Sequence, residues 1–207
     1  MHIKRQIVTT KLPIKRKGTT YVARTLSNLN NSVPVMVALR EMLGLAKTGK
    51  EVEKIIQQKL VSINGRTVEG YKESIQLFNI FKADKTYILI ILPTGKFSLQ
   101  PTTSTERLCK VIGKKLLKNN QIQLNLHDGT NILSKGKISI GDSVYVDSSS
   151  KIKKHVSFEK GKEGWIISGR YIGLKCKIQS KEGKNTNVLV HDKDAATKLN
   201  EPQIFVI

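Results

Sequence analysis

The sequence has little of what extracellular and membrane proteins depend on. Its 2 cysteines, Cys109 and Cys176, are far apart, with no CxxC pair and no histidine at metal-ligand spacing. We expect both to be reduced thiols in a core. The longest apolar run, Tyr87 to Leu92, has the length of a strand, whereas a membrane span needs roughly 18–20 apolar residues. The N-terminus also lacks the apolar stretch of a signal peptide. These absences predict a cytoplasmic protein.

Motifs for catalysis are absent as well. The sequence contains no GxSxG, HExxH, EF-hand loop or GxGxxG. Gly44 to Glu51 nearly matches the phosphate loop GxxxxGK[ST], but Glu51 stands where a hydroxyl must reach magnesium, and a helical pattern precedes it instead of a strand. We therefore expect no enzymatic activity, no cofactor, no metal site and no small-molecule substrate. An RNA-modifying enzyme with a dispersed site is an open alternative.

Acidic and aromatic residues are scarce. The 36 Lys+Arg against 16 Asp+Glu give a formal net charge of +20, which repels itself in the compact state unless an anionic partner neutralises it. An anionic membrane surface would attract the same charge, but it requires a basic amphipathic helix with Trp or Phe on its apolar face, which we do not find. Nucleic acid is the leading partner. With 5% aromatic residues, a base-stacking platform for single strands is poorly supported.

Residues 33–68 carry the clearest local signals, two short helices followed by a hairpin. Pro34 suits the first turn of a helix, and apolar residues at helical spacing predict that this helix continues to Gly44. Thr48 is the expected N-cap of the second helix, and Glu51 completes a capping box by accepting from the backbone N–H of the cap. The apolar residues assigned to the helices are Val35, Met36, Leu39, Met42, Leu43, Val52, Ile55, Ile56 and Leu60.

After Leu60 the apolar period changes to two, and Asn64-Gly65 supplies the positive φ angles of a type I′ hairpin turn. The predicted unit leaves a basic helix face exposed and brings several cations together beside this polar turn, an arrangement that suits phosphates. These cations are Lys47, Lys50, Lys54, Lys59 and Arg66. The alternative is a solvated helical hairpin whose lysines only keep the protein soluble.

The first 24 residues contain basic residues and no acidic ones; Lys4, Arg5, Lys15, Arg16 and Lys17 are among them. We interpret this segment as a basic arm with little core-forming pattern, which becomes ordered only against a polyanion. The alternative is an unstructured terminus that is merely solubilising.

From Tyr71 onward the pattern is mostly that of short strands and turns, which favours a small barrel or sandwich. A short helix is expected at Thr105 to Cys109 and a linker at Ser148 to Ser150. Glycines divide the last segment, which predicts a compact barrel with Arg170 and Lys175 in a loop; a barrel without a ligand is the alternative. The expected strands are Ser74–Phe81, Lys85–Leu92, Phe97–Gln100, Lys110–Leu117, Gln121–Leu126, Lys137–Val146 with a break at Gly141-Asp142, Trp165–Ser168, Leu174–Gln179 and Asn187–His191.

The order of these parts resembles one known family. The stretches that carry the resemblance are SVPVMVALREMLGLAKTGKEVEKI with VSINGRTV, then LCKVIGKK and ISIGDSVYVD, then GWIISGRYIG before a terminal IFVI. Together, over nearly the whole chain, they are similar to the archaeal and eukaryotic small-subunit (30S/40S) ribosomal protein family commonly called S-four-e. The implied fold is α+β and mostly β: a basic N-terminal arm, a small two-helix plus hairpin RNA-binding domain, a central β domain and a C-terminal KOW-like SH3-type β-barrel.

The resemblance also implies domains and contacts. The domains are the arm (1–32), an RNA-binding domain of the ribosomal S-four type with its following strands (33–100), the central β domain (101–150) and the KOW-like barrel with C-terminal strands (151–207). Together with the basic pattern, it makes these residues the candidate RNA contacts: Lys4, Arg5, Lys15, Arg16, Lys17, Arg40, Lys47, Thr48, Lys50, Lys54, Lys59, Asn64, Gly65, Arg66, Gly169, Arg170, Gly173 and Lys175.

One loop departs from the family pattern. Where relatives usually read GGRNIGRVG, Ser168 to Cys176 reads SGRYIGLKC and lacks the first and last glycines, the asparagine and the second arginine. The predicted function is a structural constituent of the small ribosomal subunit that binds and stabilises folded small-subunit rRNA and so supports translation. Neighbouring small-subunit ribosomal proteins are the other expected partners, and no homo-oligomer is expected. A translation factor that uses the same RNA-binding module is a further alternative.

Overall fold

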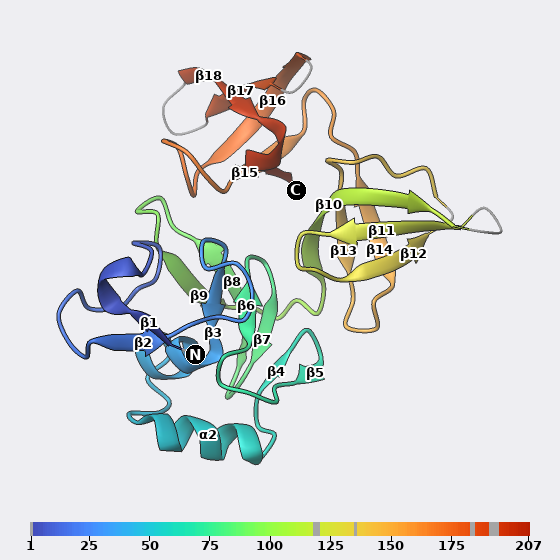
Figure 1. Cartoon of the computed structure of the whole chain (residues 1–207). Coiled ribbons are helices and arrows are strands. Elements are labelled where there is room, and N and C mark those ends of the chain that lie inside the picture. The colour runs from blue at the N-terminus through green and yellow to red at the C-terminus, as the bar shows by residue number, and fades with distance from the viewer. Residues whose placement is uncertain (1, 118–120, 135, 183–184, 191–194) are drawn as a thin grey trace. The chain divides into compact units, whose positions relative to one another are not determined.

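The computed structural model divides into two compact units, Met1–Thr105 and Glu106–Ile207 (Figure 1). It describes residues 2–117, 121–134, 136–182, 185–190 and 195–207; His191, the expected end of a strand, lies outside these ranges. Within them, no helix is long and apolar enough to cross a membrane. Antiparallel sheets dominate both units, so the prediction of a mostly β fold with two short helices is confirmed.

The first unit combines the arm, two short helical segments and a small sheet. β1 pairs with β2, β3 pairs with β6, and five strands form a sheet in the order β5-β4-β7-β8-β9. The elements are β1 (His2–Lys4), the 3-10 turn η1 (Arg5–Ile7), β2 (Tyr21–Ala23), β3 (Ser32–Pro34), α1 (Val35–Val37), the π-helical turn η2 (Ala38–Met42), α2 (Gly49–Gln57), β4 (Ser62–Ile63), β5 (Arg66–Thr67), β6 (Ser74–Gln76), β7 (Ile80–Lys82), β8 (Thr86–Ile91) and β9 (Phe97–Pro101).

The arm is more ordered than its composition suggested. β1 and β2 pair in the register Ile3↔Val22, and Leu12 and Val22 are buried. Few apolar residues of the arm are buried, as expected, and the pairing of β1 with β2 folds it back on itself, which the sequence pattern did not predict.

The first helix is shorter and less regular than predicted. Pro34 is its N-cap at the end of β3 and does not lie in the first turn. After α1 the Leu43 N–H donates to Ala38 O at 3.0 Å, which makes η2 a π-type turn. Residues 33–39 are all buried, so packing on every side decides this geometry instead of one apolar stripe. The predicted end at Gly44 is confirmed, with φ 68° at that residue.

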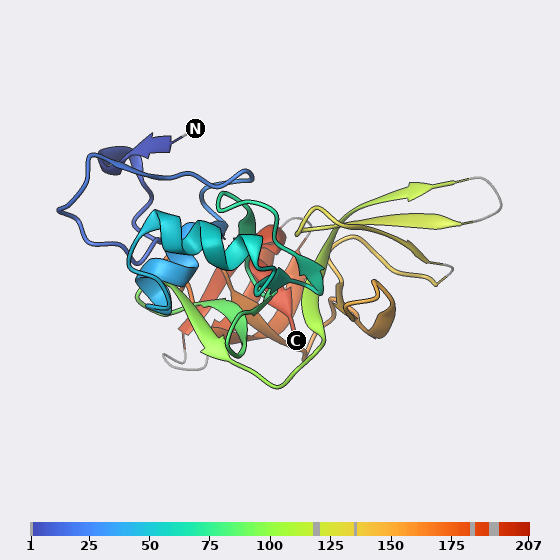
Figure 2. The ribbon, with the colours of Figure 1, turned by 90° about the horizontal axis from the view of Figure 1, so that it is seen from below.

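α2 is regular and lies beside the short helical turn of α1 and η2 (Figure 2). It buries Val52 and Ile56. Leu60, however, is 59% exposed, so the assignment of Leu60 to the apolar stripe is wrong. The reason is that α2 ends at Gln57. Lys59, with φ 56°, then turns the chain away before Leu60 can continue the helix.

The predicted hairpin is confirmed. Asn64 and Gly65 have φ angles of 52° and 85°, as a type I′ turn requires, and Ile63 pairs with Arg66. The expected single strand Ser74–Phe81 is instead two strands, β6 and β7. Phe78 separates them at φ 61°, and its N–H donates to Leu89 O at 2.8 Å. The break takes the chain from its pairing with β3 into the five-stranded sheet.

The second unit contains two five-stranded sheets, ordered β12-β11-β10-β13-β14 and β18-β17-β16-β15-β19. The elements are β10 (Arg107–Leu116), β11 (Ile122–Leu126), β12 (Asn131–Ser134), β13 (Ser143–Val146), β14 (Ile152–Val156), β15 (Glu163–Ile166), β16 (Lys175–Glu182), β17 (Asn185–Val190), β18 (Ala195–Asn200), the 3-10 turn η4 (Glu201–Gln203) and β19 (Ile204–Val206).

The helix expected at Thr105 to Cys109 is wrong, because β10 begins at Arg107. Residues 107–111 are all buried, so they show no alternation, and a short buried strand cannot be distinguished from a helix by periodicity. The break expected at Gly141-Asp142 is confirmed, because β13 begins at Ser143, but the part expected as strand before the break is not one. The preceding residues form a loop in which the Ser139 N–H donates to Asp142 Oδ2 at 2.9 Å.

The linker expected at Ser148 to Ser150 is a tight turn. The Ser150 N–H donates to Asp147 O at 2.9 Å, and β13 and β14 pair on either side of it. Neither β12 nor β14 was predicted, because both are short edge strands with exposed polar residues. The central sheet consequently continues to Val156, beyond the boundary expected at residue 150.

The C-terminal sheet encloses its own core, which includes Ile166, Ile178, Val188 and Ile204. The terminal IFV segment is the buried strand β19, which pairs with β15. At Gly164 a Cβ atom would lie 2.7 Å from Ile204 Cγ2. Only glycine therefore allows β15 and β19 to approach this closely.

Candidate nucleic-acid interface

Thr48 and Glu51 fix the start of α2. Thr48 Oγ1 accepts from the Glu51 N–H at 3.3 Å. The Glu51 carboxylate accepts from the Lys47 N–H at 2.8 Å and from the Thr48 hydroxyl at 3.0 Å. These hydrogen bonds, the one from Lys47 foremost, lower the pKa of Glu51. The predicted cap is confirmed, but the carboxylate reaches back to Lys47, one residue further than the capping box predicts. Both hydrogen-bonding roles of the Thr48 hydroxyl are thus used inside the fold.

The exposed face of α2 is less basic than predicted. Lys50 and Lys54 are exposed one helical turn apart, but Glu53 is exposed as well, whereas Glu51 is engaged at the cap. Within the part of the chain that the structure describes, Lys50 and Lys54 form no salt bridge. The basic surface is therefore an edge, formed by Lys50 and Lys54 and extended by Lys47 just before the helix. We call these three residues the α2 lysine edge.

Lys59 has a structural role at the end of α2. Its N–H donates to Ile56 O at 2.9 Å, and the Leu60 N–H donates to Ile55 O at 3.3 Å, the hydrogen-bond pair of a Schellman motif. The residue that makes this turn must adopt a left-handed conformation, which costs a non-glycine residue roughly 1 kcal/mol. An exposed lysine therefore stands where glycine would be more stable.

The hairpin turn is tied to the sheet through two of the candidate residues. Asn64 Oδ1 accepts from the Ile80 N–H at 2.9 Å, which anchors the turn to β7. Arg66 Nη2 lies 2.5 Å from Glu73 Oε2. Glu73 also accepts from the Glu69 N–H at 2.6 Å, so it is a buried carboxylate with several donors. The Arg66 side chain is still 66% exposed, which leaves part of its guanidinium accessible to a partner.

Arg40 belongs to the other helical segment, in η2. Its Nη2 lies 2.9 Å from Glu41 Oε1, and both side chains are about one-third exposed. Such surface pairs contribute little to stability, so Arg40 can exchange this partner for a phosphate.

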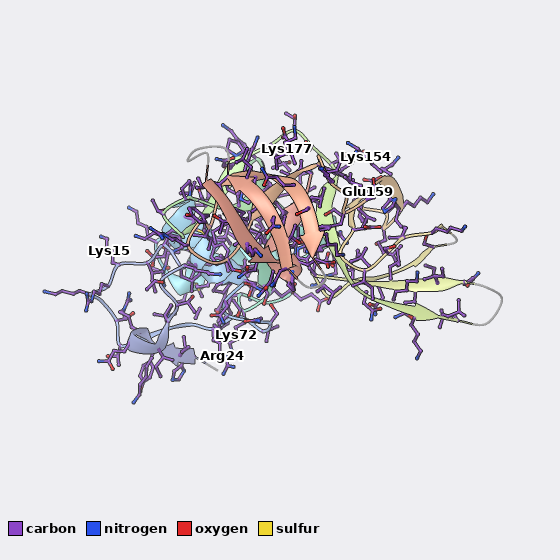
Figure 3. The ribbon with its side chains drawn as sticks, turned by 90° about the horizontal axis from the view of Figure 1, so that it is seen from above. Lys15, Arg24, Lys72, Lys154, Glu159 and Lys177 are labelled. Carbon is purple, nitrogen blue, oxygen red and sulfur yellow. The ribbon has the colours of Figure 1, made fainter. Side chains whose placement is uncertain are left out.

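The arm surrounds a hollow of about 1200 Å³. Its lining includes all the candidate cations of the arm together with Lys96, from the turn between β8 and β9, which sequence reasoning missed. Lys96 could not have been found, because nothing local distinguishes it from any other lysine in a turn. Figure 3 shows the Lys15 side chain extending away from the ribbon of the arm.

The C-terminal candidates lie in the loop between β15 and β16. Gly169 and Arg170 are exposed, and the Arg170 guanidinium lies 5.9 Å from the Tyr171 ring centre. Gly173 is buried, with φ 78°, and its N–H donates to Ile166 O at 2.8 Å. Lys175 is exposed but is the first residue of β16, so its expected position inside the loop is wrong by one residue. Gly173 closes the loop, whereas Gly169 and Arg170 form its accessible tip.

The described residues include potential metal ligands and two cysteine thiols. No group of three or more potential metal-ligating side chains occurs among them. Cys109 and Cys176 are free and buried, as predicted. Burial raises the pKa of the Cys109 thiol to about 12 and that of Cys176 to about 11, so neither is a thiolate nucleophile at neutral pH.

Comparisons with known proteins agree on one family. The profile of the ribosomal family S4e matches residues 83–152. The small ribosomal subunit protein eS4 of Methanococcus maripaludis is 30% identical over an alignment that covers 100% of this chain and 93% of that protein. The chain belongs to the ribosomal protein eS4 family.

Further members agree with this assignment. The small ribosomal subunit protein eS4 of Methanocaldococcus jannaschii is 29% identical over 86% of this chain and 80% of its own length. The crystal structure of the 30S ribosomal protein S4e from Thermoplasma acidophilum superposes with a TM-score of 0.72 and 25% identity, covering 86% of this chain and 95% of that one. This eS4 family member is a structural, non-enzymatic constituent of the small ribosomal subunit in the cytoplasm, so the predicted family and function are confirmed.

Proposed function

We propose that this eS4 family member binds folded small-subunit rRNA mainly through phosphate contacts, so that closely packed RNA helices can approach one another. The observation that supports this most strongly is the α2 lysine edge, which is exposed and without salt bridges in the described residues, on a chain of net charge +20. A-form RNA presents phosphates, 2′-hydroxyls and shape, and hides its major groove from side chains. A cationic edge with few aromatic residues fits that surface.

The contacts divide by what each side chain already does in the fold. We assign direct phosphate contacts to the α2 lysine edge and to Lys59 and Arg66, because their charged groups are exposed. Thr48 and Asn64 shape the site, since each makes hydrogen bonds within the protein, and Gly65 allows the turn. In the second unit we assign contacts to Arg170, which forms the exposed loop tip with Gly169, and to Lys175 at the start of β16.

The domain division is part of the same proposal. We place the arm at 1–32, the RNA-binding domain at 33–100, a central β domain from 101 and a KOW-like barrel at the C-terminal end. The pairing of β13 with β14 favours a last boundary after Val156 instead of residue 150. The five strands of the C-terminal sheet around one core and the glycine-closed loop at 167–174 support a small barrel of that kind.

The test is a charge reversal on the α2 lysine edge. Full-length protein is titrated with a transcript of the small-subunit rRNA from the same organism at several salt concentrations. If about eight phosphates are contacted, log affinity falls with log salt at a slope of about −6 to −7. Lys50→Glu with Lys54→Glu should sharply weaken binding, make the slope less steep by at least about 1.4–1.8, and leave the circular dichroism spectrum unchanged.

Lys153→Glu with Lys154→Glu is the matched control, because it makes the same change in charge on exposed residues of β14 in the other unit. Equal loss of affinity in both double variants would mean that only net charge matters, and unchanged affinity of the first would remove the α2 lysine edge from the interface. Sedimentation of cell extract through a high-salt gradient tests the partner: one copy per small subunit supports the proposal, and a far smaller copy number supports a loosely bound factor.

A further inference from the structure

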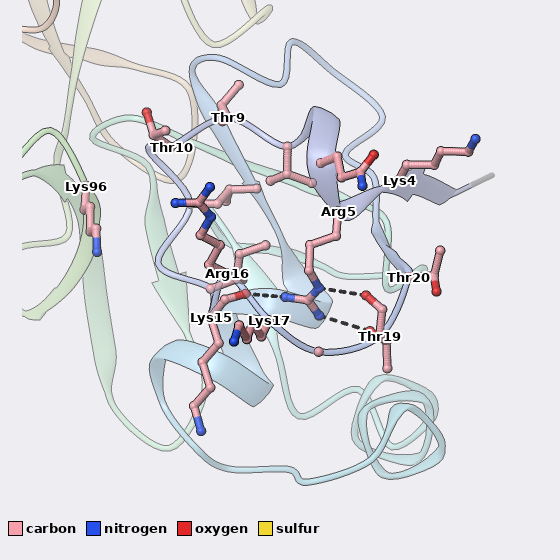
Figure 4. Close-up of a pocket in the computed structure, with 15 residues that line it drawn as sticks. Lys4, Arg5, Thr9, Thr10, Lys15, Arg16, Lys17, Thr19, Thr20 and Lys96 are labelled. Carbon is pink, nitrogen blue, oxygen red and sulfur yellow. Dashed lines mark hydrogen bonds between the residues drawn. The ribbon is translucent and has the colours of Figure 1, made fainter.

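The Arg5 side chain links separate parts of the loop between β1 and β2. Arg5 Nε donates to Thr19 O at 2.7 Å, Arg5 Nη1 donates to Lys15 O at 2.5 Å, and Arg5 Nη2 donates to Thr19 Oγ1 at 3.0 Å. Three of the five guanidinium N–H groups are therefore used inside the arm. Figure 4 shows Arg5 crossing from one side of the loop to Thr19 and Lys15, with the Lys15 ammonium end pointing away from this junction.

The loop between β1 and β2 is built around this arginine. The Arg5 N–H donates to Thr20 O at 2.9 Å, which continues the β1–β2 ladder and joins the two ends of the loop. At Gly18 a Cβ atom would lie 3.0 Å from Arg5 Nη2, and Gly18 has φ 147°. A larger residue there would push against the guanidinium. Backbone pairing, a close glycine and three hydrogen bonds thus hold one loop conformation.

The loop presents charge of one sign. The hollow inside it is lined by Lys4, Arg5, Lys15, Arg16, Lys17 and Lys96, by several threonine hydroxyls, and, among the described lining residues, by no acidic side chain. Holding several cations together without an anion is unfavourable because like charges repel. In the free protein the Arg5 hydrogen bonds hold the loop together against this repulsion. A phosphate that enters the hollow neutralises the cations and so removes the repulsion between them.

We propose that residues 5–20 form a preorganised loop that receives a segment of the rRNA sugar-phosphate backbone, and that Arg5 is its positioning residue and not one of its phosphate contacts. The inference rests on the proposed function and deepens it. Lys15, Arg16 and Lys17 make the contacts, and Arg5 determines where they lie. Binding is tighter because the loop does not have to be ordered when RNA arrives.

The test separates position from charge by using the salt dependence of rRNA binding in full-length variants. Lys15→Gln removes one phosphate contact, so the slope becomes less steep by about 0.7–0.9. Arg5→Lys keeps the charge but cannot make the forked set of hydrogen bonds. We expect Arg5→Lys to lose about tenfold in affinity, and Arg5→Gln should lose a similar amount; Arg5→Lys should also flatten the slope more than Lys15→Gln. Wild-type affinity and slope for Arg5→Lys would overturn the inference.

Thr19 gives a test without any change of charge. Thr19→Val removes the hydroxyl that accepts from Arg5 and keeps the branched shape, so it should also flatten the salt slope. Thr19→Ser keeps the hydroxyl and should bind like the wild type. A wild-type slope for Thr19→Val would overturn the positioning role, because a residue without charge alters counterion release only by moving residues that carry it.

The free protein provides an independent measurement. Trypsin should cleave after Lys15, Arg16 and Lys17 more slowly in the wild type than in Arg5→Lys or Thr19→Val, while global unfolding in urea stays the same. Equal cleavage rates would show that the loop is not held closed before RNA binds, which overturns the inference. A wild-type slope near zero would instead contradict the proposed function; a steep wild-type slope that Arg5→Lys retains contradicts only the inference about the loop.

Discussion

Lys110 is a buried cation at the junction of the two sheets of the second unit. It lies on β10 and is 5% exposed. Its Nζ donates to the backbone carbonyls of Glu201 and Ile204, the latter at 2.6 Å, and lies 5.5 Å from the ring centre of Phe158 and 5.8 Å from that of Phe205. Burial lowers the pKa of Lys110 from 10.5 to about 8; the Glu201 charge acts in the opposite direction, and Lys181 lowers it further.

The lowered pKa predicts that the contribution of Lys110 to stability rises with pH. In the unfolded chain Lys110 keeps its proton up to about pH 10.5, whereas in the folded protein it loses the proton near pH 8. Between these values the unfolded state binds one proton more, so the free energy of unfolding increases as pH rises. The difference between the two pKa values corresponds to about 3 kcal/mol. Below pH 8 this amount is the cost of keeping the cation buried.

Urea unfolding from pH 7 to 10.5 measures the effect. Lys110→Met removes the titrating group and keeps an apolar stem of similar length. The free energy of unfolding of the wild type should therefore rise by about 2–3 kcal/mol more than that of the variant over this pH range. Lys177→Met, at an exposed position of β16 (Figure 3), controls for the loss of one lysine and should follow the wild-type profile. Parallel profiles for wild type and Lys110→Met would refute the reasoning.

Three further predictions concern single positions. Gly164→Ala should destabilise the protein by about 1–3 kcal/mol in urea, because the added methyl group overlaps Ile204; Gly70→Ala, which meets no atom within 4 Å, should be nearly neutral, and equal effects would contradict the close approach of β15 and β19. Thr48→Ala should cost about 1 kcal/mol through loss of the α2 cap, whereas Thr48→Ser should not; a neutral Thr48→Ala would mean that the cap is dispensable. Lys59→Gly should raise stability by about 1 kcal/mol while rRNA affinity falls; if affinity stays unchanged, Lys59 is not a phosphate contact.

The sequence alone determined those features that depend on neighbouring residues. Asn64-Gly65 specifies its turn because few residues tolerate two successive positive φ angles, and Thr48 specifies a helix start because its hydroxyl can reach an N–H three residues later. Net charge is a sum over residues, so the class of partner could also be predicted without a fold. The family followed from the order of several motifs, each of them moderately specific.

Other predictions of secondary structure were wrong where a segment is buried on all sides, because its residues then show no hydrophobic periodicity. Residues 107–111 form a strand with five successive buried residues, and residues 33–39 are buried on every side. Hydrophobic spacing predicts secondary structure only when one face meets solvent. Leu60 was misassigned for a related reason, since the turn at Lys59 ends the helix before the apolar pattern ends.

Only the tertiary structure decided which basic side chains are structural and which are accessible. In the sequence Lys110 is one lysine among many, yet its partner carbonyl at Glu201 is 91 residues away and holds it in the interior. Arg5 likewise pairs with Thr19 across a folded loop, while Lys50 and Lys54 stay exposed. Backbone preferences act over a few residues and can be read locally. The role of a charged side chain depends on the groups that distant parts of the chain bring against it, and those are known only once the chain has folded.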